Sequence, residues 1–144
     1  MARVLVADNT LAARELYGFF LEQAGHDVVQ AKNGKELERV VRLAKHRGEP
    51  VQALIVDLIL PGIDLLEYLN GLASSGQLMP TILLCSRWAR SMVESLLPPG
   101  NLVTLADHPC QPKLLIEWLE TLQNRDVETV MTEEGEERRL CSER

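Results

Sequence analysis

Five short apolar segments alternate with five segments of helical periodicity, and this alternation is the most restrictive feature of the sequence. The apolar segments cover residues 3–7, 27–31, 51–56, 81–84 and 101–106. Each is too short for an ordinary helix and has the length of a buried strand. Strands that alternate with helices form a parallel sheet covered on both faces, with right-handed crossovers. We therefore predict an α/β fold with a doubly wound five-stranded parallel sheet and helices on both faces.

Polar and ionisable residues stand at the ends of these predicted strands. Asp8 follows the first strand, Asp57 the third and Cys85 the fourth, and His108 lies just beyond the fifth. The carboxyl ends of parallel strands meet at one edge of the sheet, where such folds bind their ligands. The order of the elements alone therefore predicts one crevice with two carboxylates, a thiol and an imidazole.

The predicted helices have recognisable apolar faces and ends. Thr10 is a suitable N-cap for the first helix, and one face of that helix carries Leu16, Phe19, Phe20 and Gln23. Further helices are predicted over about 88–97 and from Pro112 to about Asn124. These two segments contain Trp88 and Trp118, for which we expect core packing; an exposed tryptophan there would suit a protein partner.

The last twenty residues differ from the rest in composition. Residues 125–144 are rich in charge, which is typical of a solvated tail. Val127, Thr129 and Met131 alternate before Glu134-Gly135, so a short terminal hairpin is the other possibility. We expect one domain over residues 1–124, followed by this charged tail or hairpin over 125–144.

The charge balance excludes several kinds of partner. The chain has 15 Lys and Arg against 21 Asp and Glu, a formal net charge of −6. That excess of acid disfavours contact with nucleic acid or with an anionic membrane surface. No apolar run approaches the ~18 residues of a membrane span, and the amino terminus has no signal-peptide pattern. We expect a cytoplasmic protein.

Four motifs in register resemble the receiver domain of response regulators, the phosphorylated modules of two-component signalling. The run Asp57-Leu58-Ile59-Leu60-Pro61-Gly62-Ile63-Asp64 is similar to the segment around the family's phosphorylated aspartate. Residues 3–8 resemble its first strand, residues 80–86 its fourth strand, and His108-Pro109 stands at its Lys-Pro position. The resemblance extends from residue 2 to about 124.

This resemblance implies a flavodoxin-like receiver fold and a single-domain response regulator in a phosphorelay, and not an enzyme. A histidine kinase or phosphotransfer protein would place a phosphoryl group on Asp57, and a downstream protein target would bind the modified domain. Mg²⁺ would be held by Asp8, Asn9, Asp57 and the backbone carbonyl of Ile59.

Four positions depart from the family pattern. Asn9 replaces the second acidic residue, Cys85 a Thr or Ser that contacts the phosphoryl group, Leu105 an aromatic switch residue, and His108 the lysine. An amide brings no charge to a metal, a thiol is a weak donor and an imidazole is shorter than a lysine side chain. We therefore expect weakened Mg²⁺ binding. The alternative function is a phosphorylation-independent pseudo-receiver that acts as a protein-binding module.

Two further interpretations have less support. His108 could form a metal or redox cluster with Cys85 and Cys110, but the spacing matches no common ligand pattern. Flavin-binding proteins share the fold class, but they need a phosphate loop rich in Ser, Thr and Gly after the first strand, and residues 8–12 do not resemble one.

Overall fold

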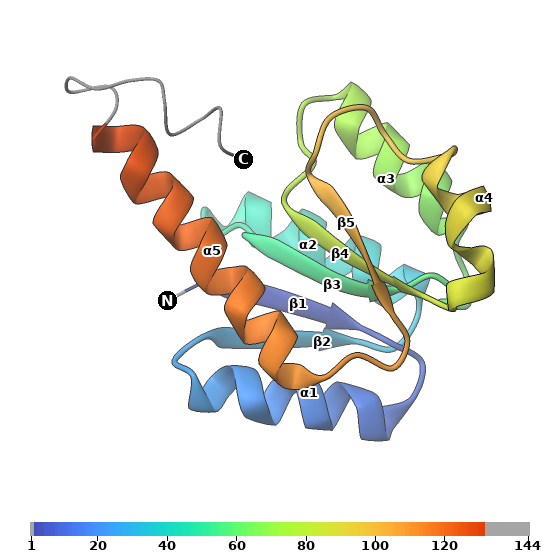
Figure 1. Cartoon of the computed structure of the whole chain (residues 1–144), viewed down its shortest axis with the longest axis horizontal. Coiled ribbons are helices and arrows are strands. Elements are labelled where there is room, and N and C mark those ends of the chain that lie inside the picture. The colour runs from blue at the N-terminus through green and yellow to red at the C-terminus, as the bar shows by residue number, and fades with distance from the viewer. Residues whose placement is uncertain (1, 132–144) are drawn as a thin grey trace.

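The computed structural model describes residues 2–131 and shows five strands and five α-helices in strict alternation (Figure 1). A short 3₁₀ turn, Arg87–Ala89, precedes α4. In chain order the elements are β1 Arg3–Ala7, α1 Leu11–Gln23, β2 Asp27–Ala31, α2 Gly34–His46, β3 Ala53–Asp57, α3 Leu65–Ser74, β4 Thr81–Cys85, α4 Arg90–Glu94, β5 Val103–Asp107 and α5 Pro112–Met131.

The five strands form one parallel sheet in the order β2-β1-β3-β4-β5. In its register Ala7 lies beside Val56, Asp57 beside Leu84, and Cys85 beside Asp107. The strand order reverses direction at β1, and the crevice beyond the carboxyl ends of β1 and β3 is where doubly wound sheets place their ligands. The predicted fold class is confirmed.

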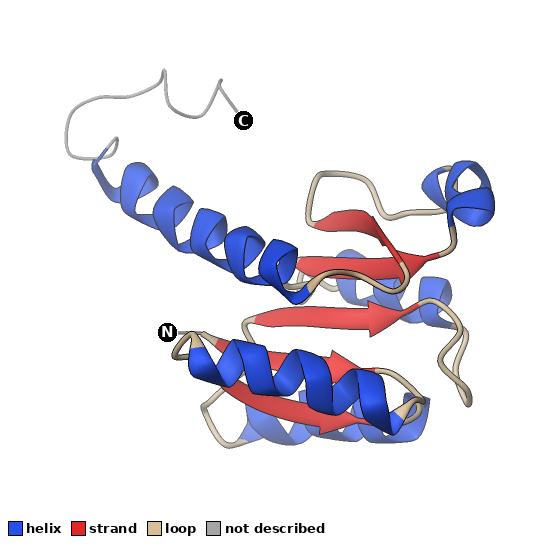
Figure 2. Cartoon of the chain, turned by 60° about the horizontal axis from the view of Figure 1, so that its bottom comes forward, coloured by secondary structure: helices blue, strands red, loops and turns tan. Residues whose placement is uncertain are grey.

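Helices cover both faces of the sheet (Figures 1 and 2). On one face, alternate strand residues such as Val4, Val6 and Ile55 pack under α1 and α5. On the other, Leu5 and Leu54 pack under α2, α3 and α4. Because both faces are buried, the interior positions of the central strands are apolar, and only their ends carry polar residues such as Arg3 and Asp57. This produces the continuous apolar runs of the sequence.

Helix α1 turns a different face to the sheet than its large apolar residues suggest. Tyr17 and Leu21 are buried, whereas Phe19 is 55% exposed and Leu16 and Phe20 are 47% and 40% exposed. Gly18 lies on the same buried face, beside Val28 and Gln30 of β2. The buried face of α1 thus carries Tyr17, Leu21 and the only glycine of the helix. Thr10 occupies the N-cap position, as predicted, but its side chain makes no capping hydrogen bond.

The helices near the carboxyl terminus differ from the predicted bounds. Helix α4 is short, and the carbonyl of Leu96, within the expected helix, instead accepts a hydrogen bond from Asn70 Nδ2 of α3 at 3.0 Å. The prediction that Trp88 packs in the core is wrong, because it is 83% exposed; Trp118 is half-buried against the α1–α5 side of the core.

Helix α5 does not end near Asn124 but continues to Met131. Val127, Thr129 and Met131 therefore belong to a helix and not to a strand of a hairpin. The remaining part of the predicted tail, 132–144, lies outside the described residues.

Candidate functional site

Two carboxylates and one imidazole meet at the carboxyl edge of the sheet. Asp8 directly follows β1, Asp57 is the last residue of β3, and His108 follows β5. His108 Nε2 lies 3.2 Å from Asp8 Oδ2 and 3.6 Å from Asp57 Oδ2. One side-chain ligand atom from each of the three residues lies within 4.8 Å of the other two. The structure thus brings together three of the predicted site residues, from three strand ends that are distant in sequence.

The loop backbone orients both carboxylates in the same way. Asp8 Oδ1 accepts a hydrogen bond from the Thr10 N–H at 2.9 Å, and Asp57 Oδ1 accepts one from the Ile59 N–H at 3.0 Å. In both aspartates the backbone N–H two residues further along the chain donates to Oδ1, and this leaves Oδ2 facing His108. Such local bonds are typical of aspartates at the start of turns. These bonds orient the Oδ2 atoms of Asp8 and Asp57 even without a bound ligand.

The site holds its two acids in a poorly hydrated position. Asp8 is 1% exposed and Asp57 is 7% exposed. Burial raises the pKa of the Asp57 carboxyl and the nearby Asp8 charge adds to this, while the Ile59 N–H and His108 act in the opposite direction. Among the described residues, His108 is the only basic residue with a side-chain nitrogen within 4 Å of either carboxylate. The site therefore has an excess of negative charge and favours a cation.

The other predicted site residues surround this centre without joining it. Asn9 is exposed next to Asp8, and Ile59 is 74% exposed beside Asp57. Cys85 is buried at the end of β4, where burial raises the pKa of its thiol, and its carbonyl accepts the His108 N–H at 3.2 Å. Leu105 packs in β5 against the core under α2, α3 and α4.

The predicted alternative of a cluster of His108 with cysteines does not form. The group of potential metal ligands that includes His108 contains Asp8 and Asp57, and neither Cys85 nor Cys110 belongs to it. Within the described part of the chain, the imidazole thus belongs to a carboxylate site.

Two features near the site were missed from the sequence. Arg14 Nη1 of α1 donates to the Asp8 carbonyl at 2.7 Å, so a guanidinium lies behind the first strand end. On the outer side, Asp107 pairs with Arg87 at 3.2 Å and with Arg90 at 3.6 Å. The sequence signal for this contact was a basic residue, Arg14, in the first turn of the helix that follows Asp8.

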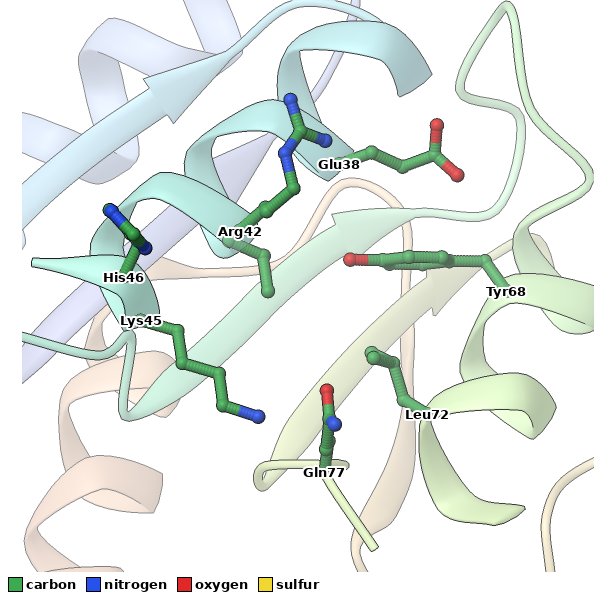
Figure 3. A pocket seen from close by; sticks show the side chains of 8 residues that line it. Glu38, Arg42, Lys45, His46, Tyr68, Leu72 and Gln77 are labelled. Carbon is green, nitrogen blue, oxygen red and sulfur yellow. The ribbon is translucent and has the colours of Figure 1, made fainter. Parts of the chain in front are cut away.

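A second hollow of about 800 Å³ lies between α2 and α3 (Figure 3). Tyr68 and Gln77 on one side face Arg42 and Lys45 of α2 on the other. Burial raises the pKa of Tyr68 to about 12, with Glu38 adding to the effect and Arg42 opposing it. None of the residues that line this hollow belongs to the site at Asp57, and no pattern in the sequence predicted it.

The sheet topology and the acids at the strand ends agree with the family that the sequence matches. The sequence matches the family described as "Response regulator receiver domain" over residues 4–120. The chain belongs to this family. The resemblance stated from the motifs is thereby confirmed, and the chain is a receiver domain with a role in two-component signalling.

Curated relatives of this receiver domain are longer proteins. It is 39% identical over 62 residues to the transcriptional regulatory protein AruR of Pseudomonas aeruginosa, and that match covers 43% of this chain and 25% of the relative. It is 33% identical over 70 residues to the response regulator RR06 of Streptococcus pneumoniae, covering 46% and 30%. The matched part thus spans less than a third of either relative.

Solved receiver structures have the same fold. The receiver domain protein from Clostridium thermocellum gives a TM-score of 0.72 at 19% identity, over 90% of this chain and 99% of that one. The chemotaxis protein CheY4 of Vibrio cholerae gives a TM-score of 0.61 at 25% identity, over 86% and 98%. Within residues 2–131, no helix is both long and apolar enough to cross a membrane.

Receiver domains bind Mg²⁺ at an acidic pocket, and this receiver domain retains part of one. Asp8 Oδ2 and Asp57 Oδ2 are carboxylate oxygens that converge, and such oxygens are suitable ligands for a hard divalent cation. The two carboxylates fit a divalent cation, while an imidazole lies where the family has an ammonium group.

Proposed function

We propose that this receiver domain accepts a phosphoryl group on Asp57 from a histidine kinase or phosphotransfer protein. The observation that supports the proposal is the position of Asp57 Oδ2, which stands at the end of β3 beside Asp8 and carries no bond to the loop backbone. In this step Oδ2 attacks the phosphorus atom of a phosphohistidine, the P–N bond breaks, and the donor imidazole leaves. A cation at Asp8 and Asp57 would neutralise the charge of the carboxylate and of the phosphoryl oxygens, and Mg²⁺ is the cofactor proposed for this role.

The output of the proposed function is a protein–protein contact. The 3₁₀ turn exposes Trp88, α4 exposes Met92, and the loop after α4 exposes Leu96; these side chains are 83%, 59% and 51% exposed. An exposed tryptophan with apolar neighbours is the type of surface that anchors a partner. We propose the face of α4, β5 and α5 as the contact for a downstream protein. On this proposal the protein is a cytoplasmic signalling module, without an enzymatic activity of its own.

The alternative function is a pseudo-receiver that binds a partner without phosphorylation. Asn9, Cys85, Leu105 and His108 favour it, because each replaces a group that the family uses for metal binding, for phosphoryl contact or for switching. The two functions share a fold and an output face, so the modification of Asp57 distinguishes them.

The deciding experiment is intact-protein mass spectrometry after incubation with a small phosphodonor and Mg²⁺. Phosphorylation predicts one added phosphoryl mass that Asp57→Asn abolishes. Asp64→Asn is the matched control, because it removes an equivalent carboxylate that lies outside the site at the start of α3. If the native protein gains no phosphoryl mass from the small donor or from a phosphorylated phosphotransfer protein, the pseudo-receiver is the correct function.

A further inference from the structure

We propose that Asp8, Asp57 and His108 form a three-ligand site for a transition-metal ion of the Zn²⁺, Co²⁺ and Ni²⁺ class, which this chain binds in preference to Mg²⁺. The inference concerns the cation site of the proposed function, but it does not depend on whether Asp57 is phosphorylated. It rests on a difference from the family pattern, since the residue that completes the site here has a nitrogen lone pair and a lysine ammonium has none.

The distances suit a shared ion. Metal–nitrogen and metal–oxygen bonds of about 2.0–2.2 Å place neighbouring ligand atoms roughly 3.0–3.6 Å apart in octahedral or tetrahedral shells. His108 Nε2 lies 3.2 Å from Asp8 Oδ2 and 3.6 Å from Asp57 Oδ2. The two carboxylates lie within 4.8 Å of each other, so a small side-chain movement closes the set.

The ligands are held by outer contacts of the kind that built metal sites have. The Thr10 and Ile59 N–H groups bind the Oδ1 atoms, and the backbone of His108 is tied to the Cys85 carbonyl. Such outer bonds fix ligand orientation and contribute to metal affinity. The carboxylates are buried, but the His108 side chain is 34% exposed, which provides a path for the ion and open positions for water or a phosphoryl oxygen.

The chemistry of the ligands favours a borderline ion over a hard one. Mg²⁺ prefers oxygen ligands and retains several waters, whereas imidazole suits Zn²⁺, Co²⁺ and Ni²⁺. Two carboxylates and a neutral imidazole give a ligand charge of −2, which matches a divalent ion. Asn9 does not supply the third acid that a Mg²⁺ site of the family uses. The exchange of lysine for His108 thus turns a positively charged neighbour of the metal into a ligand.

The test compares Co²⁺, Zn²⁺ and Mg²⁺ binding to the full chain. Co²⁺ is followed by its visible ligand-field absorption, Zn²⁺ by competition with Co²⁺, and Mg²⁺ by calorimetry. We expect the native protein to bind Co²⁺ and Zn²⁺ at least about a hundredfold more tightly than Mg²⁺. The Co²⁺ spectrum should lack the strong ultraviolet band of a thiolate ligand, which would indicate a cysteine.

The His108→Gln variant should lose at least about tenfold in Co²⁺ and Zn²⁺ affinity and change less than about threefold in Mg²⁺ affinity. His46→Gln is the matched control, because His46 lies at the end of α2 beside the second hollow. His108→Lys provides a second variant should the glutamine variant fail to fold, and it should lose the Co²⁺ spectrum completely.

Equal Co²⁺ affinities of the native protein and the His108 variants would overturn the inference, as would tighter binding of Mg²⁺ than of Zn²⁺. These results are distinct from failure of the proposed function. A protein that gains a phosphoryl mass but binds Co²⁺ without His108 refutes only the inference. A protein that binds Co²⁺ through His108 but is never phosphorylated refutes only the proposed function.

Discussion

Replacing the phosphoacceptor should make this protein more stable in metal-free buffer. Asp8 and Asp57 are both buried, and their ligand oxygens lie within 4.8 Å of each other. Two unit charges at that separation repel by about 3.5 kcal/mol at an effective dielectric constant of about 20, and His108 offsets part of this. In Asp57→Asn the amide oxygen can still accept the Ile59 N–H bond. We therefore expect the free energy of unfolding at pH 8 to rise by about 1–2 kcal/mol.

The pH dependence of this gain follows from the direction of the pKa shift. The folded-state pKa of Asp57 is raised, mainly by burial, above its unfolded value. Protonated Asp57 therefore stabilises the fold below the unfolded pKa, and this stabilisation is lost as the pH rises through the folded pKa. The advantage of Asp57→Asn should accordingly be present near pH 8 and should disappear as the pH approaches about 4.

Urea denaturation followed by tryptophan fluorescence in the presence of EDTA measures the effect. Asp64→Asn is the control, since the exposed Asp64 caps α3 by accepting the Glu67 N–H, and asparagine caps equally well. It should change the free energy of unfolding by less than about 0.5 kcal/mol. A divalent cation should then stabilise the native protein more than Asp57→Asn. The electrostatic reasoning is refuted if Asp57→Asn is no more stable than Asp64→Asn at pH 8.

Two further substitutions test the packing beside the site and the titration of a buried histidine. A Cβ at Gly34, the first residue of α2, would overlap Ile63, so Gly34→Ala should lower the free energy of unfolding by about 1–3 kcal/mol. The control Gly71→Ala in α3 places its Cβ in open space and should raise the free energy of unfolding by about 0.5–1 kcal/mol. Equal urea midpoints of the two variants would contradict this reasoning. Burial lowers the pKa of His26, whose Nδ1 accepts the Ala2 N–H at 3.1 Å, so the stability that neutral His26 provides is present above about pH 6.5 and is lost as the pH falls. His26→Asn retains an acceptor but does not titrate, and its unfolding free energy should fall less between pH 7 and pH 5; parallel profiles would show that another group is responsible.

The sheet and the position of the acids were predictable because they depend on short-range patterns. Apolar runs of strand length ending at Asp8 and Asp57 determine both the parallel sheet and the edge at which the acids meet. The approach of His108 to both acids was not predictable, because it depends on how the loop after β5 turns its ring. The sequence placed the imidazole in the crevice, but its position between two carboxylate oxygens is set by the tertiary structure.

The surface of α1 shows a limit of a different kind. Its sequence offers two apolar stripes, one with Leu16, Phe19 and Phe20 and another with Tyr17 and Leu21. Hydrophobicity alone favours the stripe with the larger residues, but the structure buries the stripe with Tyr17 and Leu21, next to Gly18, against the sheet. Helical periodicity identifies candidate faces, and the packing partner decides between them.

The burial of the sheet on both faces has a consequence for how the strands find their register. In a strand with one wet face, a slip of one residue exposes every apolar side chain, and this penalty sets the alignment. Strands β1 and β3 are apolar on both faces, so the same slip would exchange one apolar residue for another over most of their length. The exception is the carboxyl end, where a shift toward the interior would move the charge of Asp8 or Asp57 from its polar partners in the crevice to a position among aliphatic side chains, at a cost of several kcal/mol. The desolvation cost of the two acids proposed to hold the metal therefore disfavours a one-residue slip of β1 or β3 toward the interior of the sheet.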